Sequence, residues 1–351
     1  MSYLYTLPRQ TALTSFVLVV VMAGVAIAQR DAVPCAIDIP ANVIVPGGRL
    51  IRELKAEQFV AQTKHDSLKV MAANNETGPR RILLVLETGR SVPPKVRAVE
   101  SSVVVDMLSE ARSQDSFALL TARGLRKTLP FGSSPDAIVS VVKELEAQTG
   151  GSDPGNYGVL DVLLEGAQWF HESRAGDSIF LFTLGLESEH KVSYSRVRKE
   201  LADRQIRLFG LQFAPHMVGG FTGGMLRYTP RGIEELVPGL FVPNYDDVGN
   251  LSLGSGGYAL EENILGDSQH NYEISPGKLE EVKTLASRMH SAIKEYYRLT
   301  VQASRDPLSL DLIPSLRKKV PSAVTIYPRQ LPACSATQSR QSLNRGNAGS
   351  I

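Results

Sequence analysis

Between residues 82 and 213, short apolar runs alternate with amphipathic helices, and this alternation limits the fold more than any other feature of the chain. The runs lie at 82–86, 116–121, 179–184 and 207–213. Continuous apolar runs of this length are typical of strands buried on both faces of a sheet. Strands separated by helices of ten or more residues imply right-handed crossovers. We therefore predict an α/β fold with a doubly wound, mostly parallel sheet flanked by helices.

The segments between these runs carry start signals and periods typical of helices. Pro93-Pro94 opens one helix, since proline at a first helical position costs no hydrogen bond, and Ser134-Pro135 caps the next. Further helices are expected at 159–172, 194–204 and 279–293. Residues 125–129 are expected to form a short edge strand. The segment 214–271 interrupts the alternation and is rich in glycine and proline, so we interpret it as an insertion.

Shorter strand-like pieces flank the α/β part on both sides. Before it, strands are expected at 49–54, 59–61 and 68–71 within a β-rich leading segment, 29–80, which ends in a polar break at 72–80. After it, strands are expected at 296–303, 308–313 and 323–327. We assign 81–303 to the α/β domain and 304–334 to C-terminal strands, so that both flanks form a small β-rich unit. Residues 335–351 lack an apolar face and are predicted to be disordered.

The N-terminus has the pattern of an export signal. An apolar run at 15–28 ends in Ala26-Ile27-Ala28, the small-x-small pattern at which signal peptidase cleaves. The run is shorter than the roughly 20 residues needed to span a bilayer. We predict cleavage after Ala28 and a periplasmic or extracellular protein without stable membrane insertion of the mature chain. The alternative is an uncleaved N-terminal anchor.

Charge and cysteine content limit which partners and which compartment are expected. The 38 basic and 36 acidic side chains nearly cancel, and no basic face with interleaved aromatic residues stands out, so nucleic acid is not an expected partner. The only two cysteines, Cys35 and Cys334, lie near the two ends of the mature chain. An oxidising compartment would allow one disulfide between them, and two unrelated thiols are the alternative.

The elements in this order resemble a von Willebrand factor type A domain. The resemblance rests on 83–91 (LLVLETGRS), 150–152 (GGS), 179–185 (IFLFTLG) and 207–211 (RLFGL). The flanks at 51–59 and 295–299 are similar to those of exported bacterial proteins called VWFA-related. The resemblance implies a metal-dependent adhesion site at the C-terminal edge of the sheet. In that family one loop supplies the pattern D-x-S-x-S, a second loop a Thr and a third an Asp, which together hold Mg²⁺.

Compared with that pattern, most ligand positions of this chain are altered. Glu87 stands at the Asp position and is one methylene longer, while Gly89 replaces the first Ser and Leu184 the third-loop Asp. The second loop has Asn156 or Tyr157 where Thr is expected. The degenerate candidates that remain are Glu87, Ser91, Ser152 and Asp153. Too few oxygen ligands remain for the octahedral shell of Mg²⁺. We expect no cofactor, and a Mg²⁺ site rebuilt from these residues is the alternative.

The chain lacks the motifs of the common hydrolases. None of its six histidines forms HExxH or a Cys/His cluster, and no G-x-S-x-G elbow occurs. We therefore predict a non-catalytic protein that binds an unknown protein partner, with an exported hydrolase or a purely structural brace as alternatives. The segment 214–271, with Phe213 at its boundary, offers apolar groups on a glycine-rich frame as a binding surface. These groups are Phe213, Phe221, Tyr228, Leu240, Phe241, Tyr245 and Tyr258.

Overall fold

The computed structural model describes residues 35–45, 49–62, 67–89, 92–148, 158–172, 174–184, 191–213, 224–229, 232–238, 248–261, 276–303, 315–316 and 324–328. Several predictions fall on residues outside these ranges and stay predictions. They concern the leader with its cleavage site at Ala28, the tail 335–351, and the residues Ser91, Ser152, Asp153 and Cys334.

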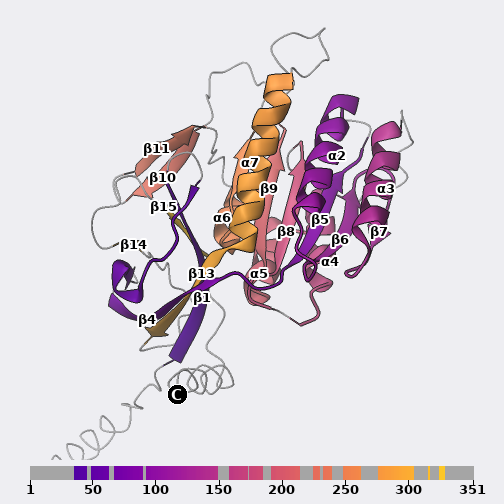
Figure 1. Ribbon diagram of the computed structural model, residues 1–351. Helices are drawn as coiled ribbons and strands as arrows, with labels where there is room; N and C mark the ends of the chain where they lie inside the picture. Colours follow the sequence, from indigo (N-terminus) through magenta and orange to yellow (C-terminus); the bar gives the residue numbers. More distant parts are fainter. Residues whose placement is uncertain are drawn as a thin grey trace, which may run out of the picture.

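A six-stranded sheet forms the centre of the molecule (Figure 1). Its order is β12-β9-β8-β5-β6-β7, with β5 (Arg81–Glu87) between β6 (Ser116–Ala122) and β8 (Ser178–Thr183). β9 (Arg207–Gln212) and β12 (Ala259–Glu261) continue one side, and the two-residue β7 (Thr128–Leu129) closes the other. All pairs are parallel except β6 with β7. The four predicted central strands each differ from the observed ones by one residue at one or both ends, whereas the edge strand expected at 125–129 is reduced to its last two residues.

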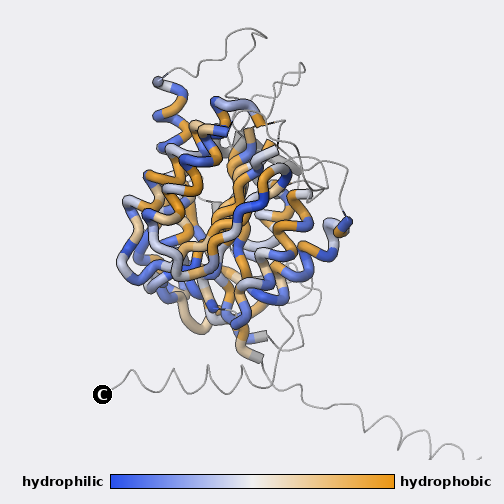
Figure 2. The backbone as a smooth tube through the Cα atoms, turned by 90° about the vertical axis from the view of Figure 1, so that its right-hand side faces the viewer, coloured by the Kyte–Doolittle hydropathy of each residue, from blue (hydrophilic) through white to orange (hydrophobic). Residues whose placement is uncertain are grey.

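Helices cover both faces of this sheet. The side chains of Ile82, Leu84 and Leu86 pack with α2 (Pro94–Ser109), α3 (Pro135–Ala147) and α7 (Pro276–Lys294), which stand in front of the sheet in Figure 1. Leu83 and Val85 point to the other face, toward α4 (Val159–Gln168), α5 (Tyr194–Asp203) and α6 (Val248–Ser255). Figure 2 shows the resulting hydrophobic strands enclosed by helices. The continuous apolar runs are therefore explained by burial on both faces.

Helix boundaries follow local chemistry. Pro93 is the N-cap of α2, and the hydroxyl of Ser134 accepts a hydrogen bond from the amide of Ala137 at the start of α3, at 3.2 Å. α4 is shorter than the 159–172 expected from the sequence: it ends with Trp169 as its C-cap.

The segment 214–271 holds more structure than the sequence indicated. β10 (Gly224–Thr229) and β11 (Gly232–Pro238) form an antiparallel pair, and α6 and β12 are components of the α/β layers rather than parts of an insertion. Phe213 and Tyr258, two of the proposed binding groups, are buried in the core that contains α7. They are therefore not available as a binding surface, which corrects that expectation. The side chains of the other five groups lie outside the described residues.

The second sheet is antiparallel and larger than the small flanking unit we expected. It has seven strands, with the path β14-β3-β4-β13-β1-β15 and β2 paired to β1. The strands are β1 (Cys35–Val45), β2 (Arg49–Leu50), β3 (Phe59–Gln62), β4 (Ser67–Glu76), β13 (Tyr296–Ala303), β14 (Ser315–Leu316) and β15 (Val324–Ile326). β4 runs through most of the polar break predicted at 72–80. β13, which we placed in the α/β domain, pairs with β1 and β4 instead.

One face of this sheet carries its own core. Alternate residues Ile37, Ile39, Ala41 and Val43 of β1 pack with Tyr297, Leu299 and Val301 of β13. The Tyr297 hydroxyl accepts from the amide of Leu54 at 2.9 Å and donates to the carbonyl of Ile51 at 3.0 Å, which fixes the loop after β2.

Within the described ranges, no helix is long and apolar enough to cross a membrane.

Candidate functional site

The carboxyl-terminal edge of the parallel strands is where ligands gather in open α/β sheets, at the point where the strand order reverses. Here that point lies between β5 and β8, because β6 and β7 follow β5 on one side and β9 and β12 follow β8 on the other. Glu87 ends β5 and Thr183 ends β8. Arg123 comes directly after β6, next to Ala122, which is paired with Glu87 in the parallel register.

The Glu87 carboxylate is completely buried and is bonded within the protein. Its Oε1 accepts from Nη1 of Arg123 at 2.7 Å. Its Oε2 accepts from the Thr183 hydroxyl at 2.6 Å and from the Leu184 amide at 2.8 Å. Glu87 thus receives one cationic donor and two neutral donors from the ends of β6 and β8. Charge-assisted hydrogen bonds of this kind are the stronger class in proteins.

The backbone conformation around Arg123 positions its side chain beside Glu87. Arg123 has φ 48° and Gly124 has φ 86°, so two successive residues occupy the left-handed region. The Thr88 amide donates to the carbonyl of Ala122 at 2.8 Å, and the Thr88 hydroxyl donates to that of Arg123 at 2.7 Å. A Cβ on Gly124 would lie 2.5 Å from the carbonyl oxygen of Thr88, so only glycine fits there.

A second carboxylate, Glu100 of α2, lies in the same part of the molecule. Its side chain is 3% exposed, and its Oε1 has no hydrogen-bond partner among the described residues. Burial raises the pKa of Glu100 well above its usual value, and the negative charge of Glu87 raises that pKa further, against an opposing effect of Arg97. Burial therefore favours the neutral form of Glu100.

The described residues do not fit a Mg²⁺ site. Glu87 has both oxygens engaged by protein donors, Gly89 supplies no side-chain oxygen, and Leu184 contributes its amide to Glu87 while its side chain packs on the apolar core. Among the described side chains, no group of three or more His, Cys, Asp or Glu residues is arranged to hold a metal ion. Asp161 serves instead to accept from the amide of Gly158 at the start of α4, at 3.1 Å.

Sequence reasoning singled out Glu87 but missed its partners Arg123 and Thr183. A signal was available: a charged residue at the end of a central buried strand needs a counter-charge. The parallel register places the residue after the neighbouring strand beside it, and Arg123 is that residue. Glu100 gave no such signal, because a glutamate in an amphipathic helix ordinarily faces solvent.

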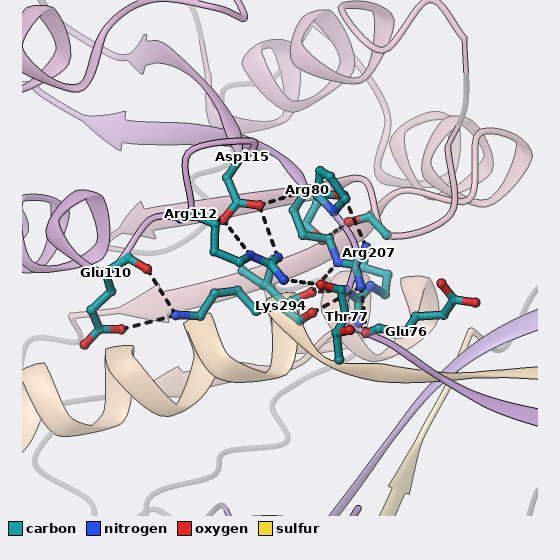
Figure 3. A network of polar contacts seen from close by, with 12 residues as sticks. Glu76, Thr77, Arg80, Glu110, Arg112, Asp115, Arg207 and Lys294 are labelled. Atoms are coloured by element: carbon teal, nitrogen blue, oxygen red, sulfur yellow. Dashed lines mark hydrogen bonds and ion pairs between the residues drawn. The ribbon is translucent and has the colours of Figure 1, made fainter.

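A second polar cluster lies at the opposite, amino-terminal edge, where the two sheets meet (Figure 3). The carbonyls of residues 292–294, at the end of α7, and of Glu295 just after it accept hydrogen bonds, each from one or two of three side chains. Arg207 of β9 donates to Ala292 and Ile293, Arg80 donates to Ile293 and Lys294, and Asn42 of β1 donates to Ala292 and Glu295. These carbonyls would otherwise be unsatisfied at the helix end.

Charge in this cluster is balanced mainly by dipoles and aromatic rings. Arg207 is completely buried, and its guanidinium lies 4.3 Å from the Tyr296 ring centroid, with Arg80 at 4.8 Å from the same centroid. Arg207 also donates to the Asn42 side-chain oxygen at 3.0 Å. Burial lowers the pKa of Arg207 to about 10, so the side chain remains charged at pH 7. The helix carbonyls and the rings stabilise that charge.

Of the six histidines, His290 is the one that the structure buries. It lies in α7 with its ring edge-on to Phe117, and its Nδ1 is 3.4 Å from Oε2 of Glu110, although neither ring nitrogen forms a hydrogen bond with a described residue. Burial, and then the charge of Lys294, lower its pKa to about 4. His290 is a neutral core residue. His171 is exposed, and the other four lie outside the described residues.

Comparisons with known proteins found similar solved structures, but no family model and no curated protein matches the chain. Among solved structures, it is similar to an aerotolerance-related membrane protein from Bacteroides fragilis (13% identity, 61% of this chain and all of that chain, TM-score 0.39). It is also similar to a von Willebrand factor type A protein from Catenulispora acidiphila (13%, 74% of this chain and 51% of that one, TM-score 0.39). A third match is proximal thread matrix protein 1 from the mussel byssus (9%, 65% and 50%, TM-score 0.42).

The α/β unit has a von Willebrand factor type A-like fold. What defines it is the strand order with one antiparallel edge strand and helices on both faces, rather than the superpositions, whose scores are low. The fold by itself implies no activity.

Proposed function

We propose that this protein is an exported, non-catalytic module that binds another protein or supports an assembly, on a doubly wound von Willebrand factor type A scaffold, without a divalent ion. Export, with cleavage after Ala28, and a periplasmic or extracellular location are parts of the same proposal. The partner is a protein that docks on the carboxyl-terminal edge of the parallel sheet.

One observation carries the proposal: the one acidic side chain at the switch point of the described sheet is already neutralised inside the fold. Glu87 is paired with Arg123 and bonded to Thr183 and the Leu184 amide. A carboxylate held in this way is a poor metal ligand, because a dication would have to displace Arg123. It is also a poor general base, since its oxygens already accept hydrogen bonds and are shielded from solvent.

The same edge presents an exposed apolar residue. Leu125, in the loop between β6 and β7, is 37% exposed and follows the strained Arg123-Gly124 pair. The Thr121 hydroxyl of β6 donates to the Leu125 carbonyl at 2.7 Å and so anchors the loop. A rigid loop with an apolar tip is suited to protein docking.

The experiment is an affinity capture with cross-linking from the native envelope, run with and without a chelator. We expect the same partner in both arms, and loss of capture in the chelator arm would contradict the proposal. Leu125→Ser tests the surface, with Met71→Ser of β4 as the matched control, because Met71 is a comparably exposed apolar residue (51%) on the antiparallel sheet. Leu125→Ser should reduce capture several-fold and Met71→Ser should not. The opposite result would move the docking surface away from this edge.

The alternative is metal-dependent adhesion through a site rebuilt with Ser91, Ser152 and Asp153, which lie outside the described residues. Calorimetric titration of Mg²⁺ and Mn²⁺ into chelator-stripped protein separates the two. Micromolar binding that Glu87→Ala abolishes would support the alternative.

A further inference from the structure

A buried carboxylate at the end of β5 requires a positive charge beside it. Glu87 has no exposed surface, and an uncompensated ion in such a place loses several kcal/mol of hydration. In a fold of this type the positive charge at this edge is expected from a divalent ion. Here it comes from Arg123, whose side chain is 12% exposed.

The position of the guanidinium is set by the backbone on both sides. Arg123 adopts a left-handed conformation, which is unfavourable for a residue with a Cβ. That cost persists only where surrounding structure holds the residue in place. The two hydrogen bonds from Thr88 and the close approach of Gly124 to the Thr88 carbonyl do so.

Among the described residues of this edge, the charge of Glu87 is paired with that of Arg123 at 2.7 Å. Burial disfavours the charged form of Glu100, whose Oε1 has no hydrogen-bond partner among the described residues. A dication in place of Arg123 would require Glu100 to ionise or would leave an excess positive charge in a region of low dielectric constant.

We infer that Arg123 is a built-in cation that takes the place of a divalent ion at this edge. It joins the ends of β5, β6 and β8 permanently through Glu87, so the edge is formed without any ion to bind or release. This inference rests on the proposed function only in that both concern the same edge, and its test does not use the partner.

The test is a charge cycle measured by thermal unfolding of the full-length protein. Arg123→Ala removes the guanidinium that is paired with the buried Glu87 carboxylate and should lower Tm by about 10 °C. Glu87→Gln alone should also lower Tm, because Arg123 then loses its ion pair with that carboxylate. The double variant Glu87→Gln/Arg123→Ala should recover more than half of that loss. Arg126→Ala is the matched control. It removes an arginine of the same loop that pairs with the 39% exposed Glu165 and donates to the Thr121 carbonyl at 2.8 Å, and it should lower Tm by less than about 3 °C.

A second measurement tests whether Arg123 takes the place of a divalent ion. In about 10 mM Mg²⁺, the Tm of Arg123→Ala should rise by several degrees because Glu87 is then open to a cation, and the double variant should not respond. The wild-type Tm should not change. A wild-type Tm that rises as much, or an Arg123→Ala variant that is fully stable or unresponsive to Mg²⁺, would overturn the inference. Chelator-sensitive capture with these Tm results intact would instead contradict the proposed function alone.

Discussion

Buried charged side chains lie at both ends of the parallel strands, but different groups compensate them at each end. At the carboxyl-terminal edge, a buried carboxylate meets a single arginine from the neighbouring strand end. At the amino-terminal edge, two buried arginines meet the carbonyls at the end of α7 and the amide of Asn42. The first edge uses one charge pair within the sheet, and the second joins both sheets and a helix. Disruption of the first edge should therefore act on the ends of β5, β6 and β8, whereas disruption of the second should act on both sheets and α7.

Reduction of a disulfide should give the largest effect, because it would release the flank strands that complete the second edge. Cys35 opens β1, and β15 is paired with β1 such that Asn42 faces Ile326. Asn42 lies seven residues, or about 24 Å, from Cys35 along β1. The eight residues from Ile326 to Cys334 span up to about 27 Å, so the chain is long enough to join them.

We therefore predict a Cys35–Cys334 bond worth about 4–5 kcal/mol by the chain-entropy model. Exported protein should migrate differently on non-reducing and reducing gels, and Cys35→Ser should abolish the difference. Two alkylatable thiols in the native exported protein would contradict the bond.

Arg207→Met should be the most damaging single change at the amino-terminal edge. It removes donors from the carbonyls of Ala292 and Ile293 and from Asn42, at a cost of about 4 kcal/mol. Arg52→Met removes an exposed ion pair to Glu295 and should cost less than about 1 kcal/mol. Urea unfolding measures both. Equal costs for the two variants would mean that this edge does not couple the sheets.

Acid should weaken the protein through His290. The pKa of His290 is lowered from 6.5 to about 4 in the folded protein, so the unfolded chain binds the proton more readily. Stability is therefore present above pH 6.5 and is lost as the pH falls from 6.5 through 4. The loss approaches about 3 kcal/mol below pH 4. His290→Leu should flatten this part of the pH profile. A profile unchanged by that substitution would mean that other groups, such as Glu110 beside His290, control it.

Thr183→Val, a substitution at the carboxyl-terminal edge, should give the smallest loss of stability. It removes one neutral donor to Glu87 and keeps the side-chain shape, so we expect a loss of about 2 kcal/mol. Thr300→Val removes a hydroxyl that donates to Asp38 in the antiparallel sheet and is the control, with about 1 kcal/mol expected. Chemical denaturation of both variants decides whether Glu87 depends on Thr183 in addition to Arg123.

The sequence predicted the α/β layers well because each central strand is buried on both faces and each helix has a cap or an apolar stripe. It predicted the antiparallel sheet poorly. β4 reads as polar after Met71, yet Asn74 and Asn75 pair with Arg298 and Tyr297. That pairing depends on a partner strand more than 200 residues away, which local patterns do not reveal.

The candidate site, too, could be predicted from the sequence only in part. Altered ligand positions at Glu87, Gly89 and Leu184 were visible in the sequence, because they depend on residue type alone. The partner of Glu87 was not, since Arg123 is brought to it by the register of β5 and β6. The α6 helix was missed because it is short and contains glycine and serine, and its burial against β9 overrides its weak propensity.

The pairing of β1 with β13 also has a consequence for the order of events during synthesis. Thr300 donates to Asp38, which lies 262 positions earlier in the chain, so β1 can pair with β13 only after most of the chain has been made. At roughly 5–20 residues per second, β1 would remain without this neighbour for tens of seconds after it is made. Its long row of unpaired backbone groups is then open to association with other chains. The nascent protein therefore has a period of vulnerability that the finished fold does not show, and a chaperone that shields extended segments would be of most use during it.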